Sequence, residues 1–119
     1  MTSRIDRELM RGAGPVAVLN LLSRREMYGY ELVHTLARDS EGVLEMRQST
    51  LYPMLYNLEA KGLIESEWRE VESGRRRKYY SLTAEGRRKL VADREQWRAL
   101  TSAMEKLGVL GPRPQGADA

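Results

Sequence analysis

The sequence contains no cysteine, and His34 is its only histidine. Without cysteine, neither a disulfide framework nor a thiolate metal site can form. A single histidine also excludes a metal site built from several histidines, although sites made of carboxylates stay open. We therefore expect no metal and no other cofactor. The lack of thiols also fits a protein of the reducing cytoplasm.

Long apolar runs are missing as well. No stretch is apolar for long enough to cross a bilayer. The N-terminus carries Arg4, Asp6, Arg7 and Glu8 where a signal peptide would need an apolar segment. The sequence thus predicts a cytoplasmic protein with no membrane partner. It also lacks a glycine-rich phosphate loop, a nucleophile elbow and a paired acid and base, so we do not expect an enzyme.

What is present is enough for one domain. The chain has 119 residues, and 41% of them are hydrophobic, which excludes a wholly disordered protein. The formal net charge is +3 and the isoelectric point is about 9.4. A modest positive charge is compatible with nucleic-acid binding but is weak evidence for it, so the position of the positive residues decides the interpretation.

Two helices are predicted in the first third of the chain. A charged extension over residues 1–12 has the apolar spacing of a helical turn or two and is interrupted at Gly12–Gly14. A first core helix then starts at Pro15, which suits a first helical turn, and continues to about Ser23. A second helix opens at Tyr28–Tyr30 and ends before Gly42.

A third helix and a hairpin follow. Ser49 or Thr50 is the expected N-cap of the third helix, with Pro53 in its first turn and Gly62 at its end. The period then changes from helical to alternating on both sides of a turn at Ser73–Gly74, which predicts two antiparallel strands.

A long last helix closes the fold. Thr83 is its expected cap, and the helix runs to about Leu107 before Gly108 stops it. The order of elements predicts a mainly α (α+β) fold, a winged helix-turn-helix with a C-terminal dimerisation helix. We expect the DNA-binding domain with its N-terminal helical extension over residues 1–82, the dimerisation helix over residues 83–108 and a flexible tail over residues 109–119.

The start of the third helix carries the side chains that we expect to contact DNA. A helix fits the major groove of B-DNA, and its N-terminal residues reach the base edges. In the alternative interpretation, Ser49 and Thr50 only cap the helix while Tyr52 and Tyr56 pack on the domain. Those two tyrosines share a face that lies off the leucine stripe, which favours contact with DNA. The predicted contacts on this helix are Gln48, Ser49, Thr50, Tyr52, Pro53, Tyr56 and Asn57.

The densest positive run of the chain lies at the predicted hairpin tip. It consists of Arg75, Arg76, Arg77 and Lys78. A basic tip can enter the minor groove or hold phosphates beside it. It can also be a solvated turn that protects a sheet edge from aggregation. Because the run follows a candidate recognition helix directly, we predict that it binds DNA. The strand residues Glu65 and Glu67 are expected to face away from the DNA.

The last helix has an apolar stripe with spacings of three, four and seven residues. One small winged-helix core cannot cover so long a stripe. The stripe therefore predicts an interface with the helix of a second chain. The helix could also pack back onto its own chain's first helix. A two-fold dimer would read a palindromic operator.

Trp97 could sandwich a flat aromatic ligand across the dimer axis, although a buried interface anchor is the simpler role. The predicted interface residues are Leu90, Trp97, Leu100, Met104 and Leu107.

Three segments in this order are specific as a set: Tyr28–Leu32, Thr50–Ile64 and Arg77–Gly86. Together they resemble the PadR family of transcriptional regulators, in its short branch with a single C-terminal helix. The resemblance implies a dimeric winged-helix protein, usually a repressor, that contacts DNA with the start of the third helix and with the wing. It also implies that Tyr28 and Tyr30 approach the phosphate backbone. Trp97 resembles the position at which some relatives bind aromatic drugs.

The function expected from residues and resemblance is a dimeric, sequence-specific DNA-binding transcriptional regulator. We expect a repressor that a small aromatic effector relieves. The alternative is a winged-helix module for protein–protein contact that does not read DNA.

Overall fold

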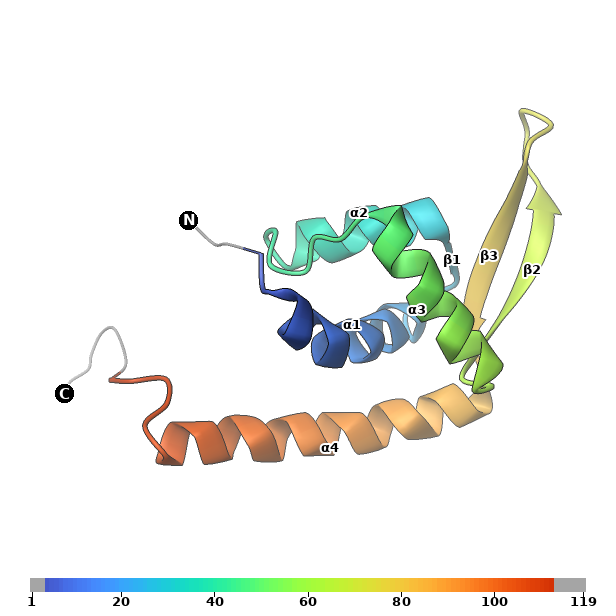
Figure 1. The fold of residues 1–119 in the computed structure, drawn as a ribbon. Coiled ribbons are helices and arrows are strands. Elements are labelled where there is room, and N and C mark those ends of the chain that lie inside the picture. The colour runs from blue at the N-terminus through green and yellow to red at the C-terminus, as the bar shows by residue number, and fades with distance from the viewer. Residues whose placement is uncertain (1–3, 113–119) are drawn as a thin grey trace.

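Helices and strands follow one another in the predicted order, with one added strand. The computed structural model describes residues 4–112. In Figure 1, three helices pack together, a hairpin stands beside them and the last helix passes along one side. The elements are α1 (Arg7–Leu22), β1 (Met27–Tyr28), α2 (Gly29–Asp39), α3 (Gln48–Ala60), β2 (Ile64–Glu70), β3 (Arg76–Leu82) and α4 (Ala84–Lys106). The predicted mainly α, winged helix-turn-helix fold is therefore confirmed.

The first helix is continuous, so the predicted interruption at Gly12–Gly14 is wrong. Gly14 is buried inside α1, and a Cβ atom at this position would lie 2.6 Å from Cε of Met54. The glycine therefore leaves room for the Met54 side chain of α3 and does not end the helix. Pro15 cannot donate a hydrogen bond to the preceding turn. Packing of an apolar face outweighs these local preferences. Besides Gly14, the buried residues of α1 are Met10, Val18, Leu19, Leu21 and Leu22.

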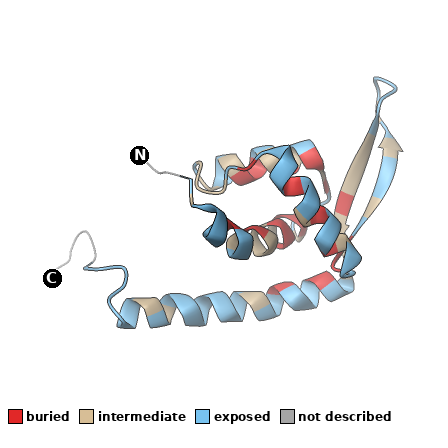
Figure 2. Ribbon diagram, in the orientation of Figure 1, coloured by how far each residue is buried: buried red, intermediate tan, exposed pale blue. Residues whose placement is uncertain are grey.

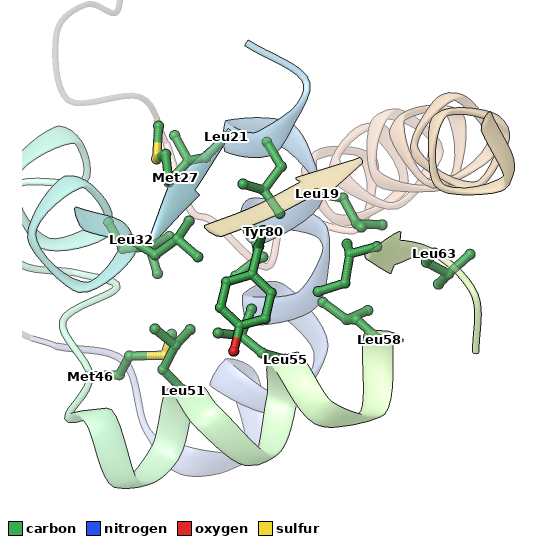
Figure 3. Packing of buried hydrophobic residues seen from close by; sticks show 14 of the residues in the cluster. Leu19, Leu21, Met27, Leu32, Met46, Leu51, Leu55, Leu58, Leu63 and Tyr80 are labelled. Carbon is green, nitrogen blue, oxygen red and sulfur yellow. The ribbon is translucent and has the colours of Figure 1, made fainter. Parts of the chain in front are cut away.

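The start of α3 also differs from the prediction. Its N-cap is Arg47, in extended backbone at φ −82° and ψ 163°, and no side chain caps the helix. Ser49 and Thr50 therefore lie inside the first turn, and Pro53 falls in the second. Met46, just before the cap, and Leu51 are both buried in the core (Figure 3). This arrangement matches a hydrophobic staple, which fixes where the chain enters a helix.

The core lies between the three short helices and one face of the sheet. Its fully buried side chains include Leu19, Leu32, Leu51, Leu55 and Ile64. Figure 3 shows Tyr80 of β3 among the leucines of α3. Desolvation raises the pKa of the Tyr80 hydroxyl, and the neighbouring Tyr52 and Glu59 raise it further. The sheet thus contributes a large buried side chain that ties the hairpin to α3.

The sheet has three strands in the order β1–β3–β2, all antiparallel. The predicted hairpin of β2 and β3 is present, with Ile64 opposite Leu82 and Glu70 opposite Arg76. β1 was not predicted, because its two residues are too few to show an alternating pattern. It pairs Met27 with Tyr80 and therefore joins the start of α2 to the hairpin.

The last helix is long and mostly exposed (Figure 2). As predicted, Thr83 caps it, and Oγ1 of Thr83 accepts a hydrogen bond from the backbone N–H of Gly86 at 2.9 Å. Gly108 follows the helix with φ +75°, as expected of a glycine past a C-cap. Most of the predicted tail, residues 113–119, lies outside the described part of the chain. Within residues 4–112, no helix combines the length and apolarity needed to span a membrane.

Candidate nucleic-acid interface

The outer face of α3 carries every residue predicted there to contact DNA. Leu51, Leu55 and Leu58 turn inward and are buried. Since no side chain caps the helix, the hydroxyls of Ser49 and Thr50 are not used as caps. Tyr56 is 73% exposed and Tyr52 is 42% exposed. The exposed residues are Gln48, Ser49, Thr50, Tyr52, Pro53, Tyr56 and Asn57.

A hydrogen bond joins the hairpin to one flank of α3. Oγ of Ser66 in β2 donates to a carboxylate oxygen of Glu59 in α3 at 2.6 Å. The N-terminal end of α2 lies on the same flank, since a Cβ atom at Gly29 would lie 2.4 Å from the hydroxyl of Tyr52. The outer face of α3, the wing and the start of α2 therefore form one continuous surface.

The wing ends in a tight turn that projects a basic tip (Figure 1). The backbone N–H of Val71 donates to the carbonyl of Arg75 at 2.8 Å, and Gly74 has φ +83°, a conformation that favours glycine. Arg75 lies in the turn and Arg76 begins β3, and both side chains are exposed. Arg77 and Lys78 are half-buried.

Because successive residues of a strand lie on opposite faces, the cations of the wing are divided between the two faces of the sheet. On the face that carries Tyr80, the Arg76 guanidinium lies 5.3 Å from the ring centroid of Trp68, and the Lys78 ammonium lies 5.9 Å from it. On the other face, the Arg77 guanidinium lies 4.4 Å from the centroid of Tyr28. Arg76 and Lys78 therefore lie on the α3 side of the wing, while Arg77 packs toward β1.

The wing is anchored by an ion pair that sequence reasoning missed. Arg69 of β2 donates to both carboxylate oxygens of Glu26, in one case at 2.8 Å. The hydrogen bond from Arg69 lowers the pKa of Glu26, and the hydrogen bond to Glu26 raises the pKa of Arg69. The guanidinium also lies 4.7 Å from the ring centroid of Tyr79. The two partners are 43 residues apart, so no local pattern could reveal them.

The two tyrosines on either side of Gly29 have different surroundings. Tyr28 lies in β1, half-buried beneath Arg77, with its ring centroid 5.5 Å from that of Tyr79. Tyr30 is 52% exposed, and its ring packs edge-on against His34 with the two ring centroids 4.4 Å apart. Glu65 and Glu67 alternate with Ser66 along β2 and so lie on the sheet face opposite Tyr80.

The residues predicted to form a seam on α4 fall into two groups. Leu90 is 2% exposed and belongs to the core of its own chain, so it offers almost no surface to a second one. Trp97, Leu100 and Leu107 are 40%, 45% and 76% exposed, and Met104 is half-buried. A shallow pocket of about 350 Å³ is lined by Trp97, Arg98, Thr101, Ser102 and Glu105.

The helix α4 also makes the contact with α1 that the sequence left open as an alternative. The Arg94 guanidinium donates to the side-chain oxygen of Asn20 in α1 at 2.8 Å. Beyond this contact the helix continues, and most of its residues are exposed (Figure 2).

The fold is that of a winged helix-turn-helix protein. Three helices pack beside a three-stranded sheet, the basic hairpin projects from that sheet, and the third helix has an exposed outer face. Residues 18–92 match the model of the transcriptional regulator PadR-like family. The chain belongs to this family, whose members are DNA-binding transcriptional regulators and not enzymes.

Individual relatives agree with this assignment. The transcriptional regulator Rv3488 of Mycobacterium tuberculosis is 39% identical over 102 residues, which cover 86% of this chain and 90% of the relative. The crystal structure of a PadR family transcriptional regulator from Eggerthella lenta has a TM-score of 0.74 at 42% identity and covers 84% of this chain and 85% of that one. A PadR family transcription regulator from Clostridium difficile has a TM-score of 0.69 at 33% identity over 78% of this chain and 95% of that one.

Proposed function

We propose that this protein is a cytoplasmic, sequence-specific repressor that binds a palindromic operator as a homodimer. The observation that carries the proposal is that the exposed face of α3 and the basic wing form one surface. The residues Gln48, Ser49, Thr50 and Asn57 supply hydroxyl and amide groups for bases or phosphates. Tyr52, Tyr56 and Tyr30 supply exposed side chains with hydroxyl groups. The ring of Tyr28 packs against the Arg77 guanidinium.

Selection of bound duplexes from a random pool tests this function directly. We expect one palindromic motif to be recovered, and its presence upstream of the protein's own gene would support repression. Binding should weaken steeply with added salt, because phosphate contacts release counterions. A protein-interaction module without DNA readout would recover no motif and show no such dependence on salt.

The contact between Gly29 and Tyr52 allows a sharper test of the surface. In Gly29→Ala, the new methyl group would overlap the Tyr52 ring and push it off its place on the surface. We expect affinity for the selected duplex to fall several-fold. The free energy of unfolding should change by less than about 1 kcal/mol, because the displaced atoms are the end of an exposed side chain. Fluorescence anisotropy and thermal melts measure the two effects.

Tyr52→Phe is the matched variant for this test. It keeps the ring in place and removes only the hydroxyl that would donate a hydrogen bond to a phosphate. If Gly29→Ala and Tyr52→Phe both bind the duplex like the wild type, Tyr52 does not contact DNA.

Dimerisation through α4 is the second part of the proposal. The apolar side chains at 97, 100, 104 and 107 share the seam spacing, and those at 97, 100 and 107 are exposed; a surface of this kind marks an interaction site. Sedimentation at micromolar concentration should give about twice the 13.7 kDa chain mass. The Leu100→Glu variant should sediment as a monomer and bind the palindrome much more weakly, whereas Glu95→Gln should stay dimeric. A monomeric wild type would contradict this part.

A small aromatic effector is the third part. Trp97 lines a shallow pocket on α4, and the same residue of a second chain would complete it if it lay across the dimer axis. Quenching of Trp97 fluorescence by flat aromatic compounds tests this idea in a Trp68→Tyr background. The background is needed because Trp68 is 55% exposed on the wing and would respond too.

A further inference from the structure

A basic groove runs along the flank of α3 that faces away from the wing. It has a volume of about 860 Å³ and lies between α3 and the N-terminal half of α1. Its floor is apolar and includes Met10, Pro15, Met46, Met54 and Leu58. Its charged residues are five cations, Arg4, Arg7, Arg11, Arg47 and Lys61, and two carboxylates, Asp6 and Glu45.

The cations of this groove are free to bind an external anion. All five side chains are exposed, and within residues 4–112 none of them forms an ion pair. Asp6 is already engaged, because its carboxylate accepts a hydrogen bond from the backbone N–H of Leu9 at 3.0 Å as the cap of α1. The five cations also outnumber the two carboxylates, so the field in the groove is positive and attracts a negatively charged partner.

The groove is continuous with the surface proposed to bind DNA. Ser49, Thr50, Pro53 and Asn57 belong to that surface and also line the groove. The wing lies on the opposite flank of α3, where Glu59 bonds to Ser66. At 100° per residue, Asn57 and Glu59 are about 200° apart around the helix, which places the groove and the wing on opposite sides.

A helix in the major groove of B-DNA has a phosphate backbone on each side of it. The wing supplies positive charge on one side of α3, and the groove supplies it on the other. We propose that Arg4, Arg7, Arg11, Arg47 and Lys61 bind the phosphates of the DNA strand on the side away from the wing. This inference rests on the proposed DNA-binding function and adds a second phosphate-binding edge to it.

The double variant Arg7→Ala/Arg11→Ala tests this edge with a fluorescent duplex carrying the motif selected by the wild type. We expect affinity to fall about tenfold at physiological salt. The slope of log affinity against log salt should become shallower by about 0.9 for each phosphate that the variant no longer neutralises. In a hydroxyl-radical footprint, protection should disappear from the backbone on the side away from the wing and remain under the wing. The variant Arg47→Ala should show the same pattern to a smaller degree.

Two control variants accompany the measurement. Arg87→Ala/Arg88→Ala removes the same charge from the exposed start of α4 and should change neither slope nor footprint. Arg7→Lys/Arg11→Lys keeps the charge and should retain the wild-type slope.

The outcomes separate the two levels of the proposal. If the wild type binds no DNA, the proposed function itself fails. If the wild type binds but Arg7→Ala/Arg11→Ala keeps the wild-type slope and footprint, only the second edge is overturned. If that variant instead sediments as a monomer with an unchanged slope, the groove is an interface with a second copy of the chain, and the inference is again overturned.

Discussion

Replacement of Gly86 by alanine is expected to destabilise the protein by about 3 kcal/mol, because there is no space for the methyl group. A Cβ atom at Gly86 would lie 2.0 Å from the backbone oxygen of Leu63 and 2.7 Å from Cδ1 of Leu82. The Leu63 oxygen is held in place, since it accepts hydrogen bonds from both the backbone N–H and Oγ1 of Thr83, at 3.1 and 3.0 Å. Relief of the clash must therefore move α4 away from the end of α3.

Thermal and urea unfolding measure this effect. A destabilisation of that size should lower the melting temperature of a chain of this length by about 10 °C. The higher helix propensity of alanine offsets at most about 1 kcal/mol of it.

Gly12→Ala is the matched control. Gly12 is also helical, but it is exposed, and a Cβ atom there meets nothing within 4 Å. Alanine at this position should stabilise the protein by about 0.5–1 kcal/mol through helix propensity. If the two alanine variants melt alike, the close approach of α4 to Leu63 is not present in solution.

The triple variant Arg75→Ala/Arg76→Ala/Arg77→Ala is expected to lose most of its affinity for the selected duplex. The substitutions remove three cations from the tip of the wing, and the salt slope should become shallower by about 0.9 for each phosphate left without a cation. Arg76 should account for more of the loss than Arg77, because Arg76 lies on the α3 side of the wing while Arg77 is stacked over Tyr28. Anisotropy titrations of the triple and single variants across a salt series measure these differences.

The chain offers a control with the same charge change. Arg87, Arg88 and Lys89 are three consecutive exposed cations on α4, away from the wing. Their triple replacement by alanine should leave affinity for the duplex nearly unchanged. Equal losses from the two triple variants would mean that the wing acts only through net charge and makes no specific contact.

Much of the fold could be predicted because its signals are local. The leucine stripe of α3, the turn glycines Gly62 and Gly74 and the cap Thr83 each act within a few residues of themselves. The prediction failed where a distant contact outweighed a local preference. Gly12–Gly14 predict an interruption and Pro15 predicts a new helix start, but α1 continues through all four residues, with Gly14 buried against the Met54 side chain of α3.

The sequence predicted which residues belong to the candidate site, but it did not predict how they are arranged in space. All of the α3 residues proposed from the sequence are exposed, since the leucine spacing leaves that face outside. Leu90 fits the seam spacing of α4 as well as Leu100 does, yet it is buried in its own chain. Spacing places a residue on a helix face, but it cannot say how far along the helix the core extends.

The sequence alone determined two features, the helix that begins beside Ser49 and the basic run Arg75–Lys78 at the hairpin. Helix periodicity, strand alternation and turn glycines are properties of neighbouring residues, so no distant contact is needed to predict them. Only the tertiary structure decided that the Glu26–Arg69 pair anchors the wing and that Arg76, rather than Arg77, lies on the α3 side of it. It also decided that five cations of α1, α3 and the adjoining residues share one groove. These features join segments far apart in the chain, and such segments meet only when burial of the common core brings them together.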